Sequence, residues 1–263
     1  MTSGIVIFYS IFPFFDEKDL PVPLSFSIGR YRYLMYLFQV VSLAICAWNL
    51  TSIDLLFVNL LGLAAATVDR LRERLSDSVK NAEKSIITNK NTEKLAVMQL
   101  LNIIVAEDLR ECTILHIAIL RYVDDIEAIF SFSLLIHYLT AIVLLCTSLL
   151  QLTTMVNVHS IQFLLSCIFV LTAALQSSLY HWFGNEVIVK SNQISEACYV
   201  SEWYKCDKKV HRIILILMMG SQKPIGVSIY KFALVSLTSF VTMLRWAYSF
   251  AALIRAKYIS DQR

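Results

Sequence analysis

The chain has 263 residues, of which 57% are hydrophobic and 16% are charged, and its formal net charge at pH 7 is +3. Its mean hydropathy is +0.62. Soluble globular domains are roughly 45–50% apolar and about 25% charged, so this composition excludes an ordinary soluble domain and indicates a polytopic membrane protein. Residues 128–185 contain no Asp, Glu, Lys or Arg. That run has room for two membrane spans of about 20 residues each, joined by a short hairpin.

Motifs of enzymes and metal sites are absent from the sequence. The six cysteines are scattered, and Cys198 and Cys206 lack both CxxC spacing and a histidine pair. The five histidines show no HExxH spacing, and no glycine-rich phosphate loop occurs among the six glycines. We therefore expect no enzyme activity, no metal, no cofactor and no nucleic-acid partner. We also expect no signal peptide of the usual design.

The first third of the chain predicts one complete span. Gly4–Phe15 is apolar but only about twelve residues long, too short to cross a bilayer alone. It is typical of the end of a span whose beginning is absent, and a re-entrant segment is the alternative. Asp16–Gly29 is predicted to be a loop because it contains two prolines and a glycine. Leu34–Ile53 is uncharged and predicts a span, and the helix is expected to continue past Val68 into water.

The next part predicts a loop and then a long amphipathic helix. Asp77–Lys94 is polar and is predicted to be a loop. After it, apolar residues recur every three or four positions, which marks one face of a helix: Leu109, Cys112, His116, Ile119, Val123, Ile126 and Phe130. Asp124, Asp125 and Glu127 lie mostly off this face and are typical of a solvated surface. The helix then enters a span from Ile129 to about Leu152.

The last part predicts two further spans and one helix outside the membrane. Ile161 to about His181 is a span, followed by a polar exit over residues 185–195. Tyr199–Met219 contains an apolar stretch too short to span, and it predicts a helix that ends at Gly220. The final span is expected within Ser221–Lys257, opening at the Lys-Pro turn. Thr153–Ser160 is a short polar turn.

Loop charges predict the orientation of the chain. Residues 69–121 carry nine Lys and Arg, residues 185–223 carry six, and the turn at 153–160 carries none. Basic loops favour the cytoplasmic side. Both basic segments are therefore expected inside the cell, and the C-terminus outside.

Two cations interrupt the final apolar stretch. Treated as one helix, Lys231 and Arg245 are fourteen residues apart, or roughly 21 Å along its axis. An Arg near the centre of a span costs about 2.5–3.5 kcal/mol on insertion scales, so it usually faces protein or water. Two interpretations of Arg245 stay open: it lines such a face, or it extends outward to the membrane surface.

Several segments together resemble the insect odorant receptors, the seven-span chemosensory channels. The C-terminal third carries SEWYK at Ser201–Lys205, QKPIGVSIYKFALVSLTSF at Gln222–Phe240 and AYSFAALI at Ala247–Ile254. Leu109–Ser131 is similar to the helix that precedes the family's fifth span. Tyr36 and Gln39, with Asp54 later in the same helix, resemble its fourth span. Their order and spacing follow those of the family, and together the segments cover nearly the whole chain.

The resemblance implies an all-α membrane bundle that holds the end of span three and spans four to seven, so the amino-terminal helices would be missing. It divides the chain as follows: the end of span three, an extracellular loop and span four in 1–68; a cytoplasmic extension, part of an anchor, in 69–128; spans five and six in 129–190; a second anchor helix in 191–224; and the pore helix, span seven, with an extracellular C-terminus in 225–263.

The family also implies a plasma-membrane, odorant-gated, non-selective cation channel that assembles with the odorant co-receptor, as a tetramer, and binds small volatile molecules. The odorant pocket is then expected at Met35, Phe38, Gln39 and Ser42 in span four and at Phe163, Cys167, Val170 and Ala174 in span six. The pore is expected at Arg245, Leu253, Ala256 and Lys257. Because a cation in the lumen opposes cation flux, a non-conducting chain that acts only through assembly is one alternative. A gustatory receptor relative is the other.

Overall fold

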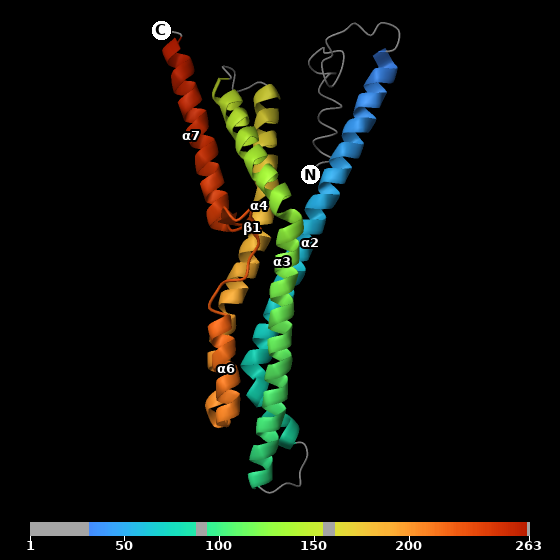
Figure 1. Ribbon diagram of the computed structural model, residues 1–263. Coiled ribbons are helices and arrows are strands. Elements are labelled where there is room, and N and C mark those ends of the chain that lie inside the picture. Colours follow the sequence, from blue (N-terminus) through green and yellow to red (C-terminus); the bar gives the residue numbers. More distant parts are fainter. Residues whose placement is uncertain (1–31, 88–93, 155–160, 262–263) are drawn as a thin grey trace. The chain divides into compact units, whose positions relative to one another are not determined.

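The computed structural model is a helical protein whose chain forms a few very long helices (Figure 1). It describes residues 32–87, 94–154 and 161–261. The predicted end of span three, the loop over 16–29 and most of the turn over 153–160 lie outside the described residues. The elements are α2 (Arg32–Ile87), α3 (Lys94–Thr154), α4 (Ile161–Asn192), α5 (Ile194–Val200), the 3-10 helix η2 (Trp203–Lys205), α6 (Lys208–Gly220), strands β1 (Ser228–Ile229) and β2 (Ala233–Leu234), and α7 (Leu237–Asp261). The predicted all-α class is confirmed.

Three of the described helices are long and apolar enough to cross a membrane, at Tyr33–Ile87, Val97–Thr153 and Leu237–Lys257. With 56 residues, α2 is about 84 Å long at 1.5 Å per residue. The hydrocarbon core of a bilayer is about 30 Å thick. The predicted extension of this helix into water therefore agrees with its length, and the span expected over 161–181 falls on α4 and stays a prediction.

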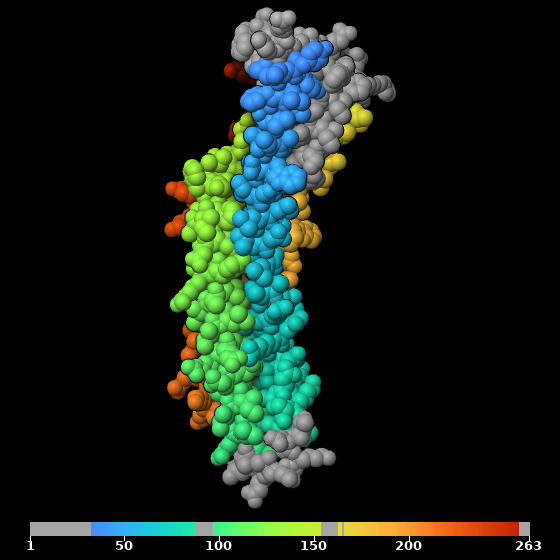
Figure 2. All heavy atoms as spheres, turned by 90° about the vertical axis from the view of Figure 1, so that its right-hand side faces the viewer, coloured from blue at the N-terminus to red at the C-terminus, as the bar shows by residue number. Residues whose placement is uncertain are grey.

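The helices contribute to two compact units. One comprises the described parts of residues 1–59, 144–176 and 248–263, and the other comprises residues 60–143 and 177–247. We call them the first and the second unit. In the second unit the later part of α2 and the earlier part of α3 lie side by side, as Figure 2 shows. Tyr122 on α3 donates a hydrogen bond to the Leu60 carbonyl on α2 at 3.3 Å.

The loop predicted over 77–94 is wrong as far as Ile87, because α2 continues to that residue. Its polar composition conceals a stripe of buried residues spaced three or four apart: Leu75, Ser78, Val79, Ala82 and Ile86. Polar neighbours such as Asp77, Lys80 and Lys84 are exposed. Packing of this narrow face against the unit is sufficient to hold the helix.

The amphipathic face predicted on α3 is confirmed. Leu109, Cys112, His116, Ile119, Val123 and Ile126 are all buried, and Phe130 is half-buried. Asp124 and Asp125 are exposed, as expected for a solvated surface. Glu127 departs from that expectation, because it is half-buried and hydrogen-bonded to a later segment.

The polar exit predicted over 185–195 is helical instead. α4 runs to Asn192 and buries Val187 and Ser191, and α5 follows almost directly. α6 begins after Asp207, whose carboxylate accepts hydrogen bonds from the backbone N–H groups of Lys209 and Val210 at 3.1 Å each. Such N-capping satisfies donors that have no partner within the helix. The helix predicted from Tyr199 ends at Gly220, as expected, but it begins only at Lys208.

The last helix begins at Leu237 and not near residue 225. Strands β1 and β2 pair antiparallel in the residues between α6 and α7, so Lys231 lies in a hairpin turn and not in a span. The 21 Å helical separation of Lys231 from Arg245 is therefore wrong. The hairpin packs closely on α4, because a Cβ added to Gly184 would lie 2.4 Å from the Val235 carbonyl oxygen. Only glycine permits that approach.

Candidate functional site

The residues predicted for an odorant pocket all lie in the first unit. On α2, Met35, Gln39 and Ser42 are half-buried and share one helical face, whereas Phe38, at the edge of that face, is 62% exposed. On α4, Phe163, Cys167, Val170 and Ala174 are all half-buried. They follow one another at spacings of three or four, so they too share a face. Neither of the two cavities described below includes any of these eight residues.

A polar contact joins the same two helices. The Gln176 side-chain amide on α4 donates a hydrogen bond to the Asp54 carboxylate on α2 at 2.6 Å. Asp54 is half-buried in an apolar stretch, where an ionisable side chain is expensive unless it has a partner. Sequence reasoning singled out Asp54 but missed Gln176. An isolated amide within a predicted span was the available signal, and its direction round the helix was not known.

The face that α7 packs is narrow. Ser239, Met243, Ala247 and Ala251 are buried and recur every fourth residue. On the opposite side lies a stripe of exposed residues around Arg245, most of them small or polar: Thr238, Val241, Thr242, Arg245, Tyr248, Ser249, Ala252 and Ala256. At about 100° per residue these eight fall within about 60° of Arg245 round the helix. We call them the polar stripe.

The four predicted pore residues divide with respect to this stripe. Arg245 and Ala256 belong to it, about 20° apart round the helix. Leu253 and Lys257 are exposed but lie about 80° and 120° from Arg245. The structure thus brings two of the four onto one face and turns Lys257 toward another.

In the second unit, ion pairs join α2 to α3 and to η2. The Arg74 guanidinium on α2 meets Asp108 and Glu111 on α3, each at 2.5 Å. Lys205 in η2 pairs with Glu83 on α2 at 3.1 Å and with Glu202 at 2.7 Å. The hydrogen bonds that Lys205 donates to Glu202 and then to Glu83 raise its pKa.

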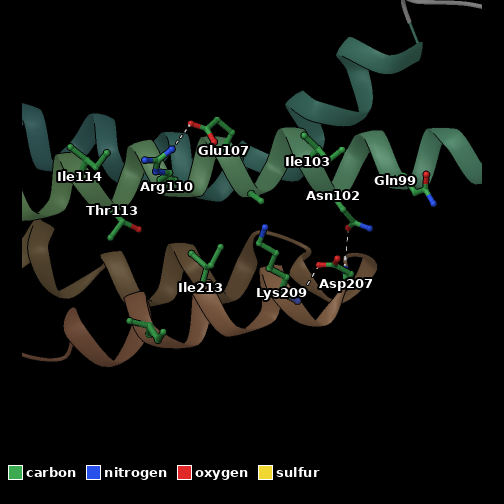
Figure 3. A pocket seen from close by; sticks show the side chains of 12 residues that line it. Gln99, Asn102, Ile103, Glu107, Arg110, Thr113, Ile114, Asp207, Lys209 and Ile213 are labelled. Carbon is green, nitrogen blue, oxygen red and sulfur yellow. Dashed lines mark hydrogen bonds and ion pairs between the residues drawn. The ribbon is translucent and has the colours of Figure 1, made fainter.

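A groove of about 790 Å³ runs between α3 and α6 in the same unit. The backbone N–H of Asp207 donates to the Asn102 side chain at 3.0 Å and closes one end, as Figure 3 shows. The lining mixes apolar and charged side chains: Gln99, Asn102, Ile103, Ala106, Glu107, Arg110, Thr113, Ile114, Asp207, Lys209, Ile213 and Ile216. Ile103, Ile114 and Ile216 are each more than half exposed. Within the described residues no group of three or more His, Cys, Asp or Glu is placed to hold a metal ion.

A family model of the 7tm odorant receptors matches residues 1–248. The chain belongs to the odorant receptor family. The family is one of membrane receptors of olfaction and not of enzymes. The resemblance inferred from the sequence segments is confirmed.

Odorant receptors of flies and mosquitoes are among the similar proteins. Putative odorant receptor 92a of Drosophila melanogaster is 26% identical over 95% of this chain and 54% of its own length. Odorant receptor 67c of the same fly is 29% identical over 56% of this chain and 35% of its own length. Odorant receptor Or1 of Anopheles gambiae is 22% identical over 95% and 64%. The chain therefore spans about a third to two thirds of the length of these relatives.

Among solved structures, the insect olfactory receptor OR5 from Machilis hrabei in complex with eugenol matches with a TM-score of 0.76. The match covers 96% of this chain and 64% of that one at 14% identity. A second structure of the same receptor matches with a TM-score of 0.71. At this identity the likeness confirms the fold of an odorant receptor.

Proposed function

We propose that the chain is a subunit of an odorant-gated, non-selective cation channel of the plasma membrane, which binds small volatile molecules and assembles with the odorant co-receptor. The polar stripe of α7 carries this proposal. A membrane helix that faced only lipid and apolar neighbours would gain nothing from Thr238, Thr242, Arg245 and Ser249 on one exposed face. Such a face suits a water-filled path.

The ligand is proposed to bind against α2 and α4. Their half-buried faces at Met35, Gln39 and Ser42 and at Cys167 and Val170 are mostly apolar with a few polar groups, the chemistry that small apolar ligands select. The related receptor from Machilis hrabei is described in complex with eugenol, a small aromatic molecule, which is the same class of ligand. Phe38, at 62% exposure, is proposed to complete the wall only where further chain covers it.

Assembly is proposed to use the second unit. α6 leaves Leu215, Ile216 and Met219 more than half exposed beside the groove that it forms with α3. Exposed apolar patches bordered by charged residues are typical of protein interfaces. The basic residues of 69–121 and 185–223 support a cytoplasmic position for this surface and an extracellular C-terminus.

Current measured with and without the co-receptor tests the proposal. The complete receptor polypeptide is expressed in cells alone and together with the odorant co-receptor, and a panel of volatile compounds is applied under voltage clamp. We expect a reversible cation current that needs both proteins. A current of equal size without the co-receptor would contradict the proposed partnership with the co-receptor.

The alternative of a non-conducting partner rests on Arg245, whose positive charge lies in the polar stripe. In that case the receptor co-purifies with the co-receptor and reaches the cell surface, yet no volatile compound changes the co-receptor's current. If the receptor co-purifies with the co-receptor but no volatile compound changes the current, the chain functions in assembly and not in conduction.

A further inference from the structure

The short hairpin between α6 and α7 holds an unusual turn. Ser228 pairs with Leu234 and Ile229 with Ala233, and the Phe232 N–H closes the turn on the Ile229 carbonyl at 2.9 Å. Tyr230 and Lys231 both have positive φ, 47° and 59°. Positive φ is the left-handed region, in which Gly and Asn are the usual residues of hairpin turns. Side chains larger than glycine keep such a conformation only where the surroundings enforce it.

Glu127 on α3 supplies that enforcement. One carboxylate oxygen accepts the Ser228 backbone N–H at 2.9 Å, and the other accepts the Ser228 hydroxyl at 2.8 Å. The Ser228 hydroxyl oxygen in turn accepts the Lys231 backbone N–H at 3.1 Å, which joins the strand to the strained turn. We call the two hydrogen bonds from Ser228 to Glu127 the clamp. Hydrogen bonds to a charged group are stronger than neutral ones.

The far side of the hairpin is also held. The Ser191 hydroxyl on α4 accepts the Ile225 backbone N–H at 3.0 Å, and the Gly184 backbone lies against Val235. α7 begins two residues later at Leu237. The Ser236 backbone N–H donates to the Ser239 hydroxyl at 3.0 Å in its first turn, and the Tyr138 hydroxyl on α3 lies 3.4 Å from the Ser239 carbonyl. The Val235 backbone N–H donates to the Val227 carbonyl at 2.9 Å, so the strand that carries Ser228 is tied to the residues directly before α7.

We propose that Glu127 is a positioning residue for α7: by holding Ser228 it fixes the hairpin from which the helix begins, and so it sets the balance between the closed and the open pore. The proposal rests on the channel function proposed above. Glu127 contacts neither odorant nor ion in this role and acts through Ser228 alone. A cavity of about 530 Å³ beside the clamp, lined in part by Asp124 and Lys231, leaves the hairpin room to move when the clamp opens.

The test compares the unstimulated current, as a fraction of the maximal odorant-evoked current, among variants of the complete receptor expressed with the co-receptor. We expect Glu127→Ala to change this fraction at least about fivefold, since a hydrogen-bonded charged group is lost. Ser228→Ala changes it in the same direction but less, because the backbone N–H still donates. Glu127→Gln stays within about twofold of the wild type, since its amide oxygen accepts that N–H.

Two comparisons make the test specific to the clamp. Asp124→Asn is the matched control, because Asp124 lines the same cavity and carries the same charge one turn earlier on α3. It should leave the fraction unchanged within about twofold. In the double variant, Ser228→Ala adds less to Glu127→Ala than it does alone, because its hydrogen bond to Glu127 is already lost and only the one from the Lys231 N–H remains to be broken. Independent effects that multiply, or an equal effect of Asp124→Asn, would overturn the proposal.

Hydrogen exchange separates the clamp from the channel function and does not depend on any current. In purified receptor, the amides of residues 228–235 should exchange faster in Glu127→Ala than in wild type or in Asp124→Asn. Equal exchange in all three would overturn the clamp. Faster exchange together with an absent wild-type current would overturn the channel function and with it the gating role. Surface biotinylation identifies variants that do not fold, and Ser228→Ala then decides in place of Glu127→Ala.

Discussion

The Asp54 carboxylate lies in an apolar stretch of α2 and accepts a hydrogen bond from Gln176 on α4. A carboxylate without such a donor would carry its full desolvation cost in this environment. Hydrogen bonds between membrane helices contribute on average about 0.6 kcal/mol and up to about 1.7 kcal/mol, since the unfolded state in the membrane also finds partners. A short contact to an ionisable group belongs at the upper end of this range.

Gln176→Leu is therefore expected to lower the stability of the receptor by about 1–2 kcal/mol, because it removes this donor and keeps the size of the side chain. Thermal unfolding of the detergent-solubilised receptor, followed by size-exclusion chromatography, measures the loss. Thr172→Val is the control, because the Thr172 hydroxyl donates to the Ile168 carbonyl of its own helix. Equal midpoints for both variants would show that the Asp54 contact contributes nothing.

At the scale of elements, the extension of α2 beyond its apolar stretch is held against α3 by charge as well as by packing. Arg74 meets two carboxylates, Asp108 and Glu111, while its own side chain is 42% exposed. Exposed ion pairs contribute about 0.2–1 kcal/mol each to stability, because the solvent screens the attraction between the two charges. The buried stripe from Leu75 to Ile86 carries the larger share of the packing.

A charge reversal tests whether this contact orients the two helices. Arg74→Glu places three carboxylates together and is expected to lower stability by about 1 kcal/mol or more, and Asp108→Arg in the same chain should recover part of that loss. Arg110→Glu is the matched control, since Arg110 pairs only within α3, with Glu107, among the ion pairs of the described residues. The same thermal-unfolding assay measures the midpoints of the wild type, Arg74→Glu, the double variant and Arg110→Glu. A loss as large in Arg110→Glu would contradict a specific contact.

Helical periodicity predicted the elements whose pattern is local. The face from Leu109 to Ile126 was readable because its spacing is undisturbed over several turns. The end of α2 at Ile87 was not, because only one residue in three or four there is buried. The hairpin was missed for a different reason. Its turn residues, Tyr230 and Lys231, are not turn formers, and Glu127, about 100 residues earlier in the chain, holds them in place.

The candidate site followed the same division. The half-buried faces of α2 and α4 were predictable from the spacing of their residues. Arg245 was recognisable because it is a charged residue within the apolar sequence of α7. The partnership of Asp54 with Gln176 and the rotation of Leu253 and Lys257 away from the polar stripe depend on how helices pack. One sequence without its folded contacts does not specify rotations about a helix axis.

For the whole molecule, Arg245 is the residue whose charge decides how well the proposed channel conducts. If the polar stripe lines the lumen, the guanidinium lies within several ångströms of a passing ion. At about 6 Å in water, two unit charges interact with about 0.7 kcal/mol, which is roughly threefold in a rate. Each copy of this chain in the assembly would add such a barrier.

Arg245→Gln is accordingly expected to raise single-channel cation conductance about threefold for a pore in which this position limits flux, and Arg245→Glu is expected to raise it further. Single-channel recording with symmetrical monovalent cations measures it at low and high ionic strength, because salt screens the charge and should shrink the difference. Arg255→Gln is the control: Arg255 is an exposed cation of the same helix about 80° round the axis from Arg245. If Arg245 instead extends to the lipid surface, both substitutions leave conductance unchanged, and the polar stripe is not the wall of the pore.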